Sequence, residues 1–106
     1  MYHVEEVESF TGRQGYGFSA VLYRDGKRVA RVIDEGNGGP ILFYWCDNRT
    51  NGEEVTISEG DKKVTVILSP EEAAFVRHAQ QQEGDILEPA GMCVVKLVAQ
   101  YEAASR

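Results

Sequence analysis

Short apolar runs, each closed by turn residues, occupy the first two-thirds of the chain. Two of these runs, residues 18–23 and 28–33, are rich in residues that favour strands. Asp25 and Gly26 stand between them, and an Asp-Gly pair in this position predicts a two-residue hairpin turn in which both residues have a positive φ. The turn sets the predicted register, in which Tyr23 faces Arg28, Leu22 faces Val29, Ala20 faces Arg31 and Phe18 faces Ile33.

Two further strands are expected beside this hairpin. Residues 3–10 are predicted to form an edge-like first strand, because their acidic side chains discourage pairing with other molecules. Residues 41–46 carry large apolar side chains on both faces, which is typical of an interior strand. Successive side chains of a strand alternate between the faces, so Tyr44 and Trp45 should point to opposite sides of the sheet.

A second hairpin is predicted from residues 55–58 and 63–68, joined by a turn at Gly60 and Asp61. Its register places like side chains and opposite charges across from each other, which supports the assignment. The predicted pairs are Val55 with Val66, Thr56 with Thr65, Ile57 with Val64 and Glu59 with Lys62.

Two helices are expected after the strands. Ser69 can cap a helix that begins at Pro70, and Gly84 is a typical helix stop. Residues 93–99 are β-branched enough for a strand, yet the apolar spacing beyond Pro89 fits one face of a helix, which we favour. The side chains on that face are Val94, Leu97, Val98 and Tyr101.

These elements together predict a single domain, residues 1–106, of the α+β class. We expect an antiparallel sheet of about five or six strands built from hairpins, with two C-terminal helices packed on one face. Apolar residues make up 42% and charged residues 26% of the chain, a balance that favours a folded globular domain over disorder.

Charge is distributed unevenly along the chain. The formal net charge is −6, whereas residues 11–33 hold five basic residues against one acid. Phosphate backbones repel an acidic chain, so nucleic-acid binding is disfavoured. It remains a further alternative for the basic hairpin, where Arg24, Arg28 and Arg31 lie among aromatic residues, a combination typical of single-stranded nucleic-acid sites and of protein interfaces. The first residues are acidic and no apolar run could span a bilayer, so we expect no signal peptide, no membrane partner and a location in the cytoplasm of a host cell.

The reactive side chains lack the spacing of known metal-binding and catalytic motifs. His3, Cys46, His78 and Cys93 are far apart in the sequence, so we predict no metal site and no cofactor. We expect both cysteines to be buried or half-buried thiols in a reducing compartment. An alternative remains in which Cys46, His78 and Asp47 form a small-ligand site or a cryptic enzyme.

Two glycine-rich stretches differ from phosphate-binding loops. Residues 36–40, GNGGP, lack the lysine of a P-loop, and residues 12–17, GRQGYG, depart from G-x-G-x-x-G. Both lead into a predicted strand instead of the helix that would bind a phosphate. We therefore interpret residues 11–17 as a glycine-rich connection and residues 35–40 as a wide hairpin loop that needs positive φ.

A family resemblance rests on two stretches of the chain, residues 17–30 (GFSAVLYRDGKRVA) and residues 34–40 (DEGNGGP). Over residues 4–47 at most, the chain resembles small uncharacterised accessory proteins of bacteriophages and plasmids. The resemblance implies a non-enzymatic accessory role, which in some such proteins is inhibition of a host defence system such as CRISPR through binding to its components. It carries no functional position over to this sequence.

The sequence thus leads to the hypothesis of non-enzymatic protein–protein binding, with a host protein or protein complex as the partner. No catalytic residue is predicted. The sequence does not determine the oligomeric state, and it is compatible with a homodimer. Binding is expected on acidic loops or on the strand that holds Tyr44 and Trp45. The predicted partner-binding residues are Asp34, Glu35, Asn37, Tyr44, Trp45, Asp47, Glu53 and Glu54.

Overall fold

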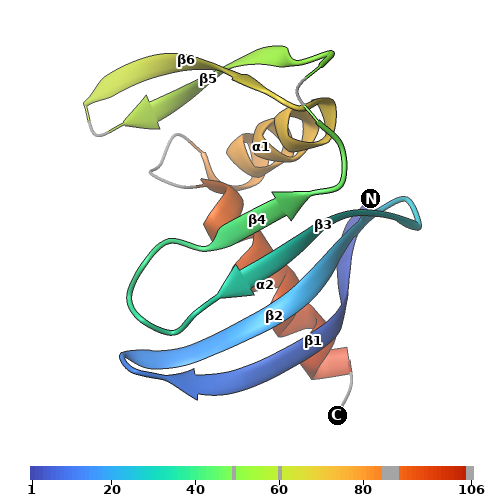
Figure 1. Cartoon of the computed structure of the whole chain (residues 1–106), viewed down its shortest axis with the longest axis vertical. Coiled ribbons are helices and arrows are strands. Elements are labelled where there is room, and N and C mark those ends of the chain that lie inside the picture. Colours follow the sequence, from blue (N-terminus) through green and yellow to red (C-terminus); the bar gives the residue numbers. More distant parts are fainter. Residues whose placement is uncertain (49, 60, 85–88, 105–106) are drawn as a thin grey trace. The chain divides into compact units, whose positions relative to one another are not determined.

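The computed structural model describes residues 1–48, 50–59, 61–84 and 89–104. Within these residues, the strands form a four-stranded antiparallel sheet with the order β1-β2-β3-β4 and a separate antiparallel pair, β5-β6 (Figure 1). The elements are β1 (Tyr2–Gly12), β2 (Gly15–Arg24), β3 (Lys27–Asp34), β4 (Leu42–Trp45), β5 (Glu53–Glu59), β6 (Lys62–Leu68), α1 (Pro70–Glu83) and α2 (Pro89–Ala104).

The predicted α+β class, the antiparallel strands built from hairpins and the two C-terminal helices are confirmed. The six strands are divided between two sheets instead of being joined in one. The chain also divides into two compact units. The first unit, Met1–Cys46 with Val94–Arg106, holds the four-stranded sheet and most of α2, and the second, Asp47–Cys93, holds β5, β6 and α1.

The β2–β3 hairpin has the predicted turn. Asp25 and Gly26 have φ values of 51° and 82°, as the Asp-Gly pair requires. The N-terminal ammonium group of Met1 donates a hydrogen bond to the Asp25 carboxylate, and this contact lowers the pKa of that carboxyl from its ordinary value. Tyr23 pairs with Arg28 as predicted. The turn chemistry alone was therefore enough to place the hairpin.

Beyond that pair, the predicted register of the hairpin is wrong by one residue. Leu22 pairs with Ala30 and not with Val29, because a β-bulge places an extra residue in β3. The bulge lets Val29 and Ala30 bury their side chains in succession, with exposed fractions of 1% and 0%. The predicted pairs of Ala20 with Arg31 and Phe18 with Ile33 fail for the same reason, and the observed pairs are Val21 with Arg31, Ala20 with Val32, Ser19 with Ile33 and Phe18 with Asp34.

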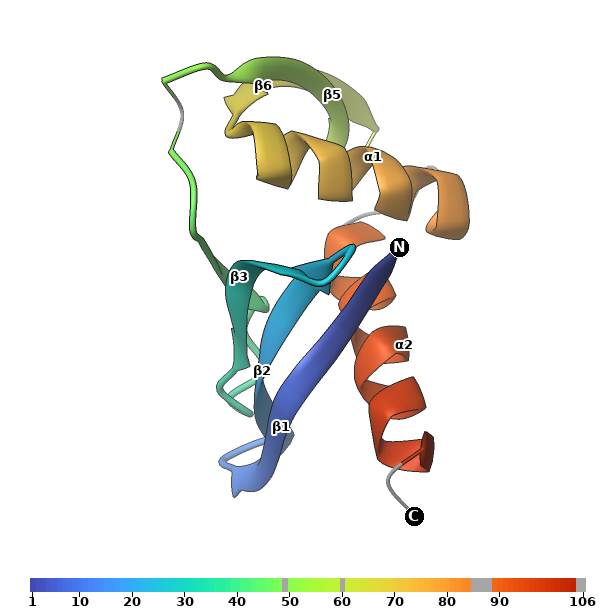
Figure 2. The same ribbon diagram turned by 90° about the vertical axis from the view of Figure 1, so that its right-hand side faces the viewer.

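One face of the four-stranded sheet forms the core of the first unit. Leu22, Ala20 and Val32 lie on this face and are almost fully buried. The part of α2 that belongs to this unit lies along the same face, with Val94 and Val98 buried (Figures 1 and 2). The opposite face is therefore the one that the helix leaves uncovered.

The strand β4 differs from its prediction. It is the outermost strand of the described sheet, next to β3, where an interior strand was expected from residues 41–46. The strands that follow it pair with each other and so do not extend the sheet. Tyr44 pairs with Arg31 and Trp45 pairs with Ala30, so the two aromatic side chains point to opposite faces as predicted.

Close contact between two glycines joins the β1–β2 hairpin to the β3–β4 loop. Gly36 has a φ of 69°, and a Cβ atom there would lie 2.9 Å from Gly12 Cα and 3.0 Å from Gly15 O. The amide of Gln14 donates a hydrogen bond of 2.8 Å to the carbonyl oxygen of Gly36. The loop is the wide hairpin connection that was predicted. Residues 11–17, however, are the strand ends and turn of a tight hairpin rather than a separate connection.

The second unit follows its predictions closely. All four predicted pairs of β5 and β6 are observed, whereas Gly60 of the predicted turn lies outside the described residues. Helix α1 begins at Pro70, the hydroxyl of Ser69 accepts a hydrogen bond of 3.3 Å from the amide of Glu72, and Gly84 caps the C-terminus. The helix packs on the strand pair through a small core of Val55, Leu68, Ala73 and Val76. The helix favoured for residues 93–99 is confirmed, since they lie within α2.

The glycine contact yields a stability prediction. Gly36→Ala is expected to lower the free energy of unfolding by about 2–4 kcal/mol, because the new Cβ adds a clash with the β1–β2 hairpin to the cost of a left-handed φ. Gly26→Ala is the matched control: its φ is 82°, but no atom of the described residues lies within 4 Å of the added Cβ. The control substitution Gly26→Ala should lower the free energy of unfolding by only about 1 kcal/mol. Urea unfolding measures both, and equal losses would contradict a stabilising role for the contact.

Candidate functional site

The face of the four-stranded sheet opposite α2, here named the outer face, presents three rows of side chains that run across the strands. Paired residues of adjacent strands lie on the same face, so the rows follow from the register. The first row is His3, Tyr23 and Arg28; the second is Glu5, Val21, Arg31 and Tyr44; the third is Glu8, Ser19, Ile33 and Leu42.

The bulge in β3 brings two arginines to the outer face. Side chains three residues apart in a regular strand point to opposite faces, so strict alternation would separate Arg28 from Arg31. With Val29 inserted, Arg28 pairs with Tyr23 and Arg31 pairs with Val21, which are two residues apart on β2. The arginines are exposed, and neither forms an ion pair with any described residue.

A second bulge, in β1, brings two acidic side chains, Glu5 and Glu8, to the outer face. Glu5 pairs with Val21 and Glu8 pairs with Ser19, with a register shift between them. Glu6 lies inside this shift with a φ of 53°. A left-handed conformation costs a residue with a side chain roughly 1–2 kcal/mol, and bulges commonly re-aim side chains next to binding sites. The strained bulge thus places an acidic edge beside the arginines.

The outer face contains a shallow hollow of about 220 Å³. Its rim is charged, with acids from β1 on one side and arginines from β3 on the other. The side chain of Glu5, beside the hollow, lies 3.3 Å from the His3 ring nitrogen Nε2. The residues of the hollow that bear on its chemistry are Glu6, Glu8, Ser19, Val21, Arg28 and Arg31.

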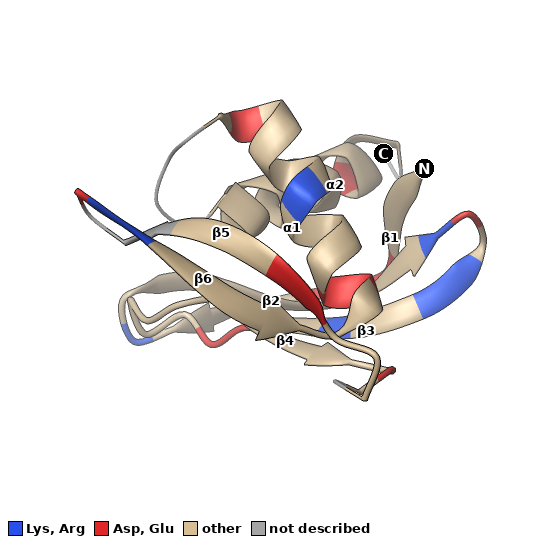
Figure 3. Cartoon of the chain, turned by 90° about the horizontal axis from the view of Figure 1, so that it is seen from above, with Lys and Arg blue, Asp and Glu red and all other residues tan. Residues whose placement is uncertain are grey.

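Charge is divided unequally between the two units. The first unit contains seven basic and seven acidic residues, so its formal charge is zero. The second contains four basic and ten acidic residues and accounts for the whole net charge of −6. Figure 3 shows basic segments on the β2–β3 hairpin, with an acidic segment at its tip. The outer face therefore belongs to a neutral unit with locally separated charges.

The predicted partner-binding residues of the β3–β4 loop have local roles. The Asp34 carboxylate accepts a hydrogen bond of 2.9 Å from the amide of Gly36, and the Asn37 side chain accepts one of 3.0 Å from the amide of Gly39. Glu35 is exposed. Both hydrogen bonds shape the loop that contacts the β1–β2 hairpin. This local role explains an aspartate and an asparagine at these positions, and no binding partner is needed to explain them.

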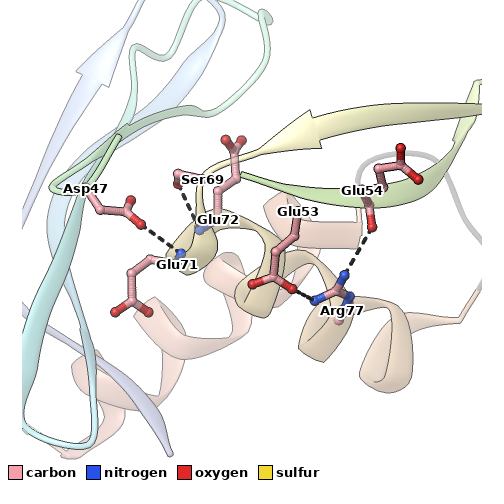
Figure 4. Close-up of polar contacts among 7 residues, drawn as sticks. All are labelled: Asp47, Glu53, Glu54, Ser69, Glu71, Glu72 and Arg77. Carbon is pink, nitrogen blue, oxygen red and sulfur yellow. Dashed lines mark hydrogen bonds and ion pairs between the residues drawn. The ribbon is translucent and has the colours of Figure 1, made fainter. Parts of the chain in front are cut away.

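The predicted residues of the second unit hold α1 in place (Figure 4). Asp47 Oδ2 accepts a hydrogen bond of 3.0 Å from the amide of Glu71, in the first turn of α1. The guanidinium group of Arg77 donates to Glu53 Oε1 at 2.6 Å and to the backbone oxygen of Glu54 at 3.1 Å. These contacts join the helix to β5 and to the segment that precedes it.

Of the two predicted aromatic residues, Tyr44 is the accessible one. It lies on the outer face with an exposed fraction of 56%. Trp45 lies on the inner face, half-buried, with its ring stacked on Phe43 at a centroid distance of 5.6 Å. The predicted partner-binding residues thus include Tyr44 but not the arginines, which the sequence indicated only as part of a basic segment beside aromatic residues.

The alternative site of Cys46, His78 and Asp47 gains no support from the positions of its residues. Cys46 is exposed, which corrects the expectation of a buried or half-buried thiol, because β4 ends at Trp45. Cys93 is buried as expected. Asp47 caps α1, and the ring of His78 stacks on Phe75 at a centroid distance of 6.3 Å.

Three further observations bear on function. Among the described residues, no three His, Cys, Asp or Glu side chains come together in a group that could hold a metal ion. No described helix has the length and apolar character needed to cross a membrane. Comparisons with protein-family models, with curated proteins and with solved structures find no match for this chain. The chemistry of the outer face is therefore the main guide to function.

The role of Asp47 yields a second stability prediction. Asp47→Ala is expected to lower the free energy of unfolding by about 1 kcal/mol, because the Glu71 amide at the helix N-terminus loses its acceptor. Asp47→Asn keeps an acceptor oxygen at the same place and should lose less than half as much. Thermal unfolding measures both variants. A wild-type stability for Asp47→Ala would show that the cap is unimportant.

Proposed function

We propose that this protein is a non-enzymatic protein-binding module that acts through the outer face of its four-stranded sheet. The observation that carries the proposal is the pair of exposed arginines, Arg28 and Arg31, which have no ion-pair partner among the described residues. Tyr44 stands beside Arg31 on the same face. Arginine and tyrosine are the residue types that most often dominate the energetics of protein interfaces.

The shape of the outer face supports a protein partner over a small ligand. Small-molecule sites are usually concave, mainly apolar and roughly 300–1,000 Å³ in volume. The hollow on the outer face measures about 220 Å³ and is rimmed by opposite charges. A shallow surface with charged rows is better matched by another surface, where complementary charges set the orientation of the partner.

We further propose that the module serves as an accessory protein of a bacteriophage or plasmid and binds a host protein or protein complex. Inhibition of a host defence system such as CRISPR is the example that the sequence resemblance suggests. The support for this cellular role is the resemblance of residues 4–47 alone. The acidic net charge agrees with a protein partner rather than a nucleic acid.

Site-specific crosslinking tests the binding face. A photoreactive phenylalanine analogue in place of Tyr44 should capture a discrete protein in host cells, and Arg31→Glu in the same chain should reduce the yield about tenfold or more. The matched control carries the analogue in place of Ile67, an apolar side chain of β6 with a similar exposed fraction of 50%.

Mass spectrometry identifies the captured protein whatever its origin. The proposal predicts a product from the Tyr44 probe that the Ile67 probe does not give. It would be refuted by the absence of any product in several hosts, or by identical products from both probes.

A further inference from the structure

We infer that the outer face binds a second copy of the same chain in a two-fold symmetric dimer. The inference rests on the proposed function, because it names a second copy of this chain as the protein that occupies the binding face. Its basis is the order of charges along the rows of the outer face.

The middle row of the outer face is complementary to itself. It runs from Glu5 on β1 through Val21 on β2 to Arg31 on β3. Adjacent strands lie about 4.8 Å apart, so the acid and the arginine are equally far from β2 on opposite sides. A two-fold axis that runs along β2 between two such faces places Glu5 of each copy over Arg31 of the other.

The distances in such an arrangement suit direct ion pairs. Two sheets packed face to face lie about 10 Å apart, a gap that a glutamate and an arginine side chain span together. Glu8 is on the same side of the axis as Glu5, and Arg28 is on the same side as Arg31. Because of the two bulges, the acids lie on one side of the axis and the arginines lie on the other. The two-fold rotation therefore places the acids of each copy opposite the arginines of the other.

The net charge of the first unit also permits contact between two copies of its outer face. Two copies of the first unit approach without net repulsion, because its seven basic and seven acidic residues cancel. A face with one sign of charge would repel its copy, whereas the outer face has separated signs that select a single relative orientation. Val21 and Ile33, which lie on the outer face within the three overlapping strands, add apolar area to the contact.

The size of the outer face sets the expected strength. With the axis along β2, the strands β1, β2 and β3 of one copy lie opposite β3, β2 and β1 of the other. Three strands at about 4.8 Å spacing and roughly six residues at about 3.3 Å rise give an overlap of about 14 by 20 Å. The dimer would then bury roughly 600 Å² in total, well below the standard size of a stable interface. The expected dissociation constant is therefore micromolar or weaker, on the order of 10–100 μM.

Sedimentation velocity with a set of charge reversals tests the inference. The wild-type chain should dimerise at micromolar to millimolar concentration. Arg31→Glu alone makes the middle row acidic, and Glu5→Arg alone makes it basic, so each should weaken self-association about tenfold or more. An equimolar mixture of these two variants should restore the dimer, and so should the double variant Glu5→Arg/Arg31→Glu, in which the signs are exchanged.

The controls separate this inference from the proposed function. Arg13→Glu and Glu35→Arg reverse exposed charges of the same unit outside the three rows and should leave the dimer unchanged. Circular dichroism confirms that each variant is folded. A wild-type chain that stays monomeric, or a dimer that is insensitive to both single reversals, overturns the inference. If the Tyr44 probe still captures a host protein in an Arg31-dependent manner, the proposed function stands without the dimer.

Discussion

One extra residue in each of two strands sets which charged side chains the outer face presents. Regular alternation would send Arg28 and Arg31 to opposite faces of the sheet, and Glu5 and Glu8 likewise. The bulges in β3 and β1 bring each pair to the outer face. In β3 the cause is the hydrophobic effect, because the extra residue allows Val29 and its neighbour to be buried in succession. Packing on the core side thus determines the charge pattern on the exposed side.

The surrounding structure keeps the bulged strands in place. The contact between Gly12 and Gly36 joins the far end of the β1–β2 hairpin to the β3–β4 loop, and only residues without a Cβ permit that approach. At the other end, the Asp25-Gly26 turn fixes where β2 and β3 begin to pair. Helix α2 covers the inner face, so the outer face is the side of this sheet on which charged side chains remain exposed (Figure 2).

The parts of the fold that could be predicted from the sequence are those with local chemical signals. The Asp-Gly turn, the Ser69 cap and the register of β5 and β6 each follow from a few neighbouring residues, and each was correct. The bulges were missed because consecutive apolar residues such as Val29 and Ala30 also fit a regular strand with two apolar faces. A bulge is favoured only when the core accepts both side chains, which is a property of the packed sheet and not of the strand alone.

The same limit applies to the candidate site. The sequence hypothesis assigned partner binding to polar residues in turns. Three of them, Asp34, Asn37 and Asp47, instead accept hydrogen bonds from backbone amides. Short polar side chains have this capacity in any loop, so their presence there says little about a partner. The arginines could be recognised from the sequence as a basic segment. That they lie on one face of the sheet follows only from the observed register, which includes the bulge. The predicted binding residues therefore included Tyr44 and not the arginines beside it.

Whether the bulge in β3 forms in solution can be measured from the register of β2 and β3. Nuclear Overhauser contacts between backbone protons report which residues face each other across the two strands. We expect contacts that pair Leu22 with Ala30 and Val21 with Arg31, together with Tyr23 and Arg28 nearer the turn. Contacts that instead pair Leu22 with Val29 and Val21 with Ala30 would mean a regular hairpin. In that case the two arginines would lie on opposite faces, and the outer face described here would not exist.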